Sequence, residues 1–67
     1  MSNLIVESYL NSTVNTILED IAKKYSIDTS KEYLTEDIPV KEIKFRYRTY
    51  TECVRMLYKN AGYLKEI

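Results

Sequence analysis

The sequence has 67 residues and a formal net charge of zero, with ten basic and ten acidic side chains. A chain of this length forms one domain at most and buries only about 60% of the surface that its unfolded form exposes. It has no histidine and a single cysteine, which excludes an internal disulfide, a zinc site and histidine-dependent catalytic relays. We therefore expect one small helical domain over residues 1–67 that is not an enzyme and holds no metal or cofactor.

The first expected element is a helix over residues 3–25. Large apolar side chains recur in it every three or four positions, which is the spacing of one helical face. They are Val6, Leu10, Val14, Ile17, Ile21 and Tyr25. Lys23 and Lys24 complement the dipole at the end of this helix, and we expect the helix to stop at residues 26–28.

A short second helix is expected over residues 29–34. Asp28 or Thr29 can cap its start, and Glu32 stands three positions after Thr29, as in a capping box. Residues 35–39 then form a turn, because the residue before Pro39 is disfavoured from helical backbone angles.

The stretch after Pro39 has two interpretations. In the first, it is one continuous helix. Apolar residues from Val40 to Leu64 step alternately by three and four positions, which is the spacing of a coiled-coil-like face. Pro39 is tolerated in the first turn of such a helix.

The second interpretation makes residues 42–49 a strand. Apolar and aromatic side chains alternate there with basic ones, and β-branched and aromatic residues favour strands. Thr49 then caps a shorter helix, with Glu52 in the capping-box position. Such a strand needs a partner, either residues 4–6 of the same chain or a second molecule.

We favour the continuous helix, so the predicted fold class is mainly α, an antiparallel helical hairpin or small bundle with a short middle helix. The alternative is an α+β fold with one strand at about 42–49, paired within the chain or between molecules. Both contain a helix from about Thr51 to Ala61. Cys53, inside that helix, is expected to be a small buried side chain rather than a reactive thiol.

Charge is divided unevenly along the chain, since residues 1–40 carry a net −4 and residues 41–67 a net +4. The basic half contains a tract, residues 41–50, that mixes cations with aromatic rings, as proteins do to neutralise phosphates and stack on nucleobases. Nucleic-acid binding is therefore one candidate function, although the pI near 6.2 counts against it. Its contact residues would be Lys41, Lys44, Arg46 and Arg48.

Seven tyrosines are the more informative excess. Tyrosine is enriched in interface hot spots and tolerates a surface that is wet when free and covered when bound. The leading prediction is a small regulatory protein, such as an inhibitor, that binds another protein through an aromatic and basic surface in its C-terminal half. The residues expected on that surface are Phe45, Arg46, Arg48, Arg55, Met56, Tyr58 and Tyr63.

The small size of the core also bears on the partners. Unaided cores of this size supply about 3–5 kcal/mol at most, and a second subunit is a common remedy. We expect a homodimer or a subunit of a larger complex, with no membrane and no small-molecule substrate as partner. The lone cysteine and the lack of a long apolar run favour the cytoplasm. The abundance of lysine, isoleucine, asparagine and tyrosine suggests a viral or phage protein acting in a host cell.

Overall fold

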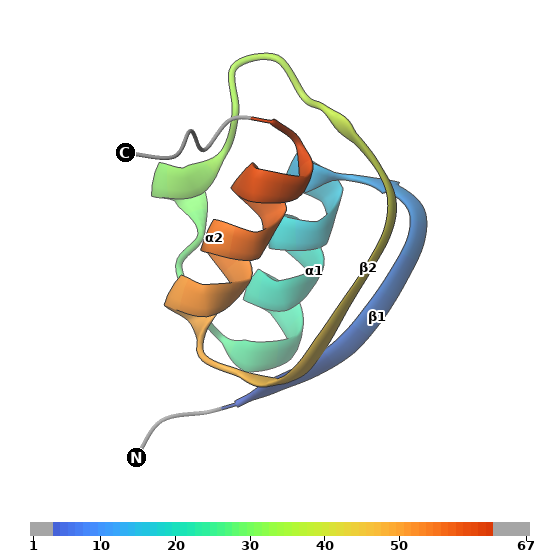
Figure 1. Cartoon of the computed structure of the whole chain (residues 1–67). Helices are drawn as coiled ribbons and strands as arrows, with labels where there is room; N and C mark the ends of the chain where they lie inside the picture. The colour runs from blue at the N-terminus through green and yellow to red at the C-terminus, as the bar shows by residue number, and fades with distance from the viewer. Residues whose placement is uncertain (1–3, 63–67) are drawn as a thin grey trace.

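Two strands and two helices alternate along the chain. The structure, a computed structural model, describes residues 4–62. The elements in order are β1 (Ile5–Thr13), α1 (Val14–Tyr25), a single 3-10 turn η1 (Ser30–Glu32), β2 (Pro39–Arg48) and α2 (Tyr50–Asn60). The two strands pair in an antiparallel sheet, and both helices lie on the same face of it (Figure 1). The other face of the sheet carries no element of the described chain.

This arrangement is an α+β fold, so the mainly α prediction is wrong. The stretch after Pro39 is a strand and then a helix, as in the alternative interpretation. The partner of β2 is β1 of the same chain, with Glu7 opposite Phe45 and Tyr9 opposite Ile43. No continuous C-terminal helix and no helical hairpin form in the described part of the chain.

The helix expected over residues 3–25 begins only at Val14, because the preceding segment is β1. Val6 and Leu10, expected on the buried helical face, lie on the open face of the sheet with 47% and 68% of their surface exposed. The inward side chains are instead Ile5, Glu7 and Tyr9. A carboxylate among the inward residues hides the alternation of a half-buried strand.

Local backbone features mark both ends of α1. Thr13 caps its start, since the side-chain oxygen accepts a hydrogen bond from the backbone N–H of Thr16. Its end is Ser26, which has the left-handed backbone conformation common after helices. The predicted stop at residues 26–28 is therefore confirmed. The buried face consists of Val14, Ile17, Leu18 and Ile21.

Only the single turn η1 forms where a helix over residues 29–34 was predicted, and the predicted capping box is absent. The Thr29 side chain makes no capping bond and is buried. Asp28 acts instead, because its Oδ1 accepts hydrogen bonds from the backbone N–H of Ser30 at 3.0 Å and from the Ser30 hydroxyl at 2.8 Å.

β2 and α2 follow each other directly at Thr49. Near the end of β2 the register shifts by one residue, and Tyr47 has a φ of 55°, so this ring leaves the inward face and is 72% exposed. Thr49 and Glu52 form a reciprocal capping box. The helix predicted from about Thr51 to Ala61 is confirmed as Tyr50–Asn60.

The core lies between the sheet and the two helices. Its buried apolar side chains come from all four elements. They are Ile5, Val14, Ile17, Leu18, Ile21, Val40, Ile43, Phe45, Cys53 and Leu57. Cys53 is fully buried, as expected.

Candidate functional site

The outer surface of α2 separates two open pockets. Thr51 and Arg55, one turn apart and both exposed, line both of them. We call the pocket toward η1 the tyrosine pocket and the pocket toward the end of β2 the methionine pocket. The two pockets with the ridge between them form the candidate site.

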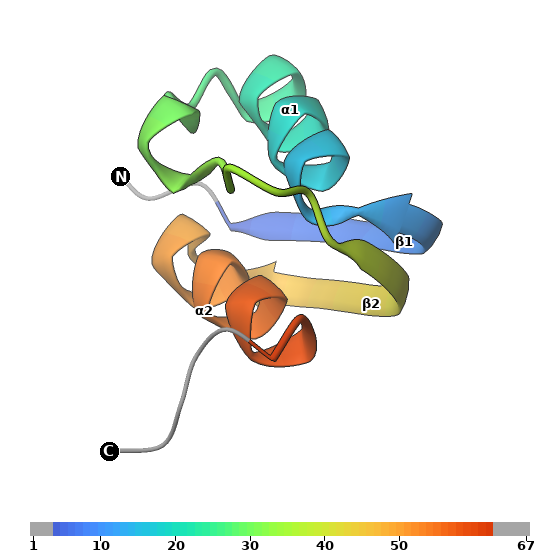
Figure 2. The same cartoon turned by 90° about the horizontal axis from the view of Figure 1, so that it is seen from above.

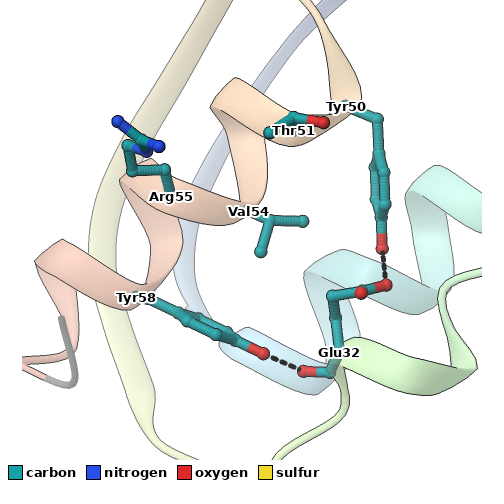
Figure 3. Close-up of a pocket in the computed structure, with 6 residues that line it drawn as sticks. All are labelled: Glu32, Tyr50, Thr51, Val54, Arg55 and Tyr58. Atoms are coloured by element: carbon teal, nitrogen blue, oxygen red, sulfur yellow. Dashed lines mark hydrogen bonds between the residues drawn. The ribbon is translucent and has the colours of Figure 1, made fainter.

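The tyrosine pocket has a volume of about 250 Å³ (Figure 3). The rings of Tyr50 and Tyr58 form two of its walls, and Val54 lies between them on α2. Both hydroxyls are bound to η1, because Tyr50 donates to Oε1 of Glu32 at 2.5 Å and Tyr58 donates to the Glu32 backbone oxygen at 2.7 Å. These two bonds fix the rings in position, so the pocket is largely pre-formed.

The methionine pocket opens where β2 passes into α2 and has a volume of about 540 Å³. Met56 supplies its apolar surface, and Arg48 and Arg55 supply two cations. One oxygen of Glu52 lies 4.0 Å from Nη1 of Arg48, a loose and exposed ion pair. Among residues 4–62, Arg55 has no ion pair.

The chemistry available around α2 is that of binding. Burial, followed by the hydrogen bond to Glu32, raises the pKa of Tyr50, so this hydroxyl stays a donor at neutral pH. Burial raises the pKa of Cys53 to about 11, which keeps its thiol protonated and unreactive. No group of histidine, cysteine or acidic residues suited to a metal ion occurs within residues 4–62.

The open face of the sheet is a second exposed surface. On this face Leu10 of β1 stands opposite Glu42 of β2, and Ser8 stands opposite Lys44. Val6 and Arg46 are also exposed on it, and Tyr47 stands at the bulge. Lys44 makes a weak contact with Glu42, 3.8 Å between the charged atoms. This face is therefore basic and partly apolar.

The residues predicted for a protein-binding surface divide into three groups. Arg48, Arg55, Met56 and Tyr58 line the two pockets beside α2. Arg46 lies on the open sheet face. Phe45 is a correction, because its side chain points inward from β2 and is 1% exposed. Tyr63 lies outside the described residues.

The basic tract is also divided by the strand. Lys41, Lys44, Arg46 and Arg48, predicted as nucleic-acid contacts, are all exposed. Of the two aromatic residues between Lys41 and Arg48, Phe45 lies on the opposite face of the sheet and Tyr47 is exposed at the bulge. Cations and stacking rings therefore do not share one surface along β2, apart from Tyr47 at its end.

Sequence reasoning missed the tyrosine pocket as a site. In the helical interpretation Tyr50 and Val54 belong to the apolar face that runs from Val40 to Leu64, and Glu32 belongs to the predicted capping box. The available signal was the spacing of Tyr50, Val54 and Tyr58, each four positions apart, which places them on one side of a helix. Nothing in the sequence indicates that η1 faces this side.

Comparison of the chain with protein-family models, with curated proteins and with solved structures gives no significant match. Its fold and its candidate site must therefore be interpreted from their own geometry. Among residues 4–62, neither helix has the length and apolar composition required to cross a lipid bilayer.

Proposed function

We propose that this chain is a small protein-binding module that acts by occupying a surface of another protein, with the ridge at Arg55 as the centre of contact. The observation that carries the proposal is the position of Arg55 between two open pockets with apolar walls. A partner that bound there could insert a side chain on each side of the guanidinium.

The composition of the ridge supports this proposal. Arginine and tyrosine are among the residues that contribute most to binding energy in interfaces, particularly beside pockets that exclude water. Arg55 has no intramolecular ion pair among the described residues to break on binding. Tyr50 and Tyr58 are already ordered by Glu32, so little rotamer entropy is lost when a partner covers them.

A protein partner is favoured over nucleic acid by the direction of one ring. Single-stranded nucleic acids are bound by stacking bases on exposed aromatic rings within a basic groove. Between Lys41 and Arg48, Phe45 faces the core and is unavailable for stacking, which leaves Tyr47 as the one exposed ring there. The net charge of zero and the pI near 6.2 also offer little general attraction for phosphates.

Site-specific photo-crosslinking in the native cell tests the proposal. A photoreactive residue at Thr51, on the ridge, should give one discrete crosslinked species. The matched control is the same residue at Glu19, which is exposed on α1. Arg55→Glu in the Thr51-labelled chain should abolish the crosslink without changing the circular dichroism spectrum. Equal crosslinking from both positions, or none from Thr51, would remove the ridge as a binding surface.

A further inference from the structure

The two edges of the sheet differ in how accessible their backbone groups are to another strand. At the β1 edge, the backbone N–H of Val6 donates a hydrogen bond of 3.1 Å to the hydroxyl of Tyr25, the last residue of α1. Lys24 of the same helix contacts Glu7 at 3.2 Å. Figure 2 shows α1 extending past β1 on that side. The β1 edge is therefore partly closed by α1.

The β2 edge is open. Because the Val6 backbone points away from β2, the alternation of an antiparallel ladder also turns Ser8 and Leu10 away from it. Their partners Lys44 and Glu42 then direct their own N–H and C=O groups out of the β2 edge. No element among residues 4–62 bonds to these outward groups.

The side chains along this edge define what fits beside it. Lys44 and Arg46 stand two positions apart on the open face, so they flank a third strand as neighbouring cations. On the helix side, the methionine pocket begins at the end of β2 and is lined by the half-buried Met56. On the open face an added strand would therefore meet a net positive charge, because Lys44 and Arg46 outnumber Glu42, which contacts Lys44 at 3.8 Å. On the other face it would meet α2 and the methionine pocket.

A second copy of the chain does not fit this edge. Pairing two β2 edges about a two-fold axis would place the two strands about 4.8 Å apart. Because α2 lies over β2 (Figure 2), the two copies of α2 would come similarly close. Packed helices need about 8–10 Å between their axes, so the copies would collide.

We propose that the β2 edge binds an extended segment of the partner as a third strand, in which acidic residues alternate with apolar ones. The acidic side chains lie opposite Lys44 and Arg46, and the apolar side chains face α2 and the methionine pocket. This inference rests on the proposed function, because it names the kind of partner that the same side of the molecule binds. Main-chain hydrogen bonds to the edge supply affinity, and the alternating side chains supply specificity.

A peptide titration followed by nuclear magnetic resonance tests this proposal on the ¹⁵N-labelled chain. The probe is a capped heptapeptide in which valine and glutamate alternate. It should shift the amide signals of Glu42 and Lys44 in a saturable way and leave those of Ser8 and Leu10 unchanged. Two further probes serve as controls, one with lysine in place of glutamate and one with alternate backbone amides methylated. Each control should bind at least about tenfold more weakly, and added salt should weaken the acidic probe.

Variants of the protein separate charge from folding. Lys44→Glu combined with Arg46→Glu should weaken the acidic probe at least about tenfold, whereas Lys23→Glu on α1 should leave its affinity unchanged. Unchanged amide spectra outside β2 show that the double variant is folded. No saturable shift at millimolar peptide, shifts at the β1 edge, or equal binding of the lysine probe would overturn the proposal. The proposal would also be overturned if the chain sedimented as a dimer in which the second copy covers the β2 amides.

The outcome is distinguishable from that of the crosslinking experiment. A specific crosslink from Thr51 together with no peptide binding would retain the ridge as a binding surface and reject strand addition. If neither the Thr51 crosslink nor peptide binding is observed, the proposed function is rejected as well.

Discussion

The hydroxyl of Tyr9 donates a hydrogen bond of 2.6 Å to Oδ2 of Asp20 and so joins the middle of β1 to α1. Burial, followed by this hydrogen bond, raises the pKa of Tyr9, while the bond holds the pKa of Asp20 below its ordinary value. Nζ of Lys24 lies 3.2 Å from both Asp20 and Glu7. The first strand is therefore fastened to the first helix by charge-assisted bonds as well as by apolar packing.

Removing the Tyr9 hydroxyl should destabilise the domain. Tyr9→Phe keeps the ring but removes its hydrogen bond to Asp20, so we expect the free energy of unfolding to fall by about 1 kcal/mol. Urea unfolding followed by circular dichroism measures the change. Tyr47→Phe is the matched control, because its ring is exposed at the bulge, and it should change stability by less than about 0.5 kcal/mol. Equal effects of the two variants would contradict this role for Tyr9.

Acid should unfold the domain through its aspartates. The pKa of Asp20 is lowered from 3.8, chiefly by the Tyr9 hydrogen bond, and that of Asp28 by hydrogen bonds from Ser30. A lowered pKa in the folded state means that the unfolded chain takes up protons first as pH falls. Stability should thus be constant above about pH 5 and decline below about pH 4. Melting temperatures recorded from about pH 5 down to about pH 2 measure this loss of stability. Asp20→Asn should make the loss smaller.

The junction at Thr49 should be sensitive to a small substitution. Thr49→Ala removes the side-chain oxygen that caps α2 and should cost about 1 kcal/mol of the free energy of unfolding. Thr51→Ala, two positions later and exposed, should be neutral or slightly stabilising, since alanine favours helices and no cap is lost. Urea unfolding of both variants provides the comparison. A Thr51 variant as unstable as the Thr49 variant would show that the cap contributes nothing.

Cys53 should report on opening of the core. Its thiol is fully buried and its pKa is raised to about 11, so a thiol reagent such as Ellman's should react only when the domain unfolds. We expect labelling in buffer to be slower than in concentrated urea by about a hundredfold or more. Fast labelling in buffer with an intact circular dichroism spectrum would show that this side of the core opens locally.

The strand β1 could not be predicted from its own sequence, for a physical reason. Val6 and Leu10 continue the helical spacing of α1, whereas the true inward residues include Glu7. The Glu7 carboxylate is accommodated because Lys24 and Tyr25, at the far end of α1, bind it. Only the tertiary structure brings these partners together, so no local pattern could reveal a strand.

The second half of the chain was more accessible to prediction. The helix after Thr49 is predictable because its capping box and its apolar spacing are local signals. The competing patterns over β2 could not be separated, since Val40, Ile43 and Tyr47 fit a helix while Ile43 and Phe45 fit a strand. The bulge at Tyr47, which turns that ring outward, has no sequence signature.

The candidate site was predictable to the extent that it lies on one element. Arg55, Met56 and Tyr58 were chosen from α2 and do line the two pockets. The contribution of η1 through Glu32 depends on how the loop returns across the helices, which the sequence does not specify. The helical interpretation of residues 40–48 predicts Phe45 on the surface, whereas the strand turns its side chain toward the core.

The pairing of β1 with β2 also determines when the protein can fold. Ile5 pairs with Arg48, so β1 leaves the ribosome without its partner and stays unpaired until β2 has also been synthesised. During that interval Ile5 and the apolar face of α1 are available to chaperones and proteases. A prematurely terminated chain would leave this apolar surface exposed, and cellular proteases would degrade the chain.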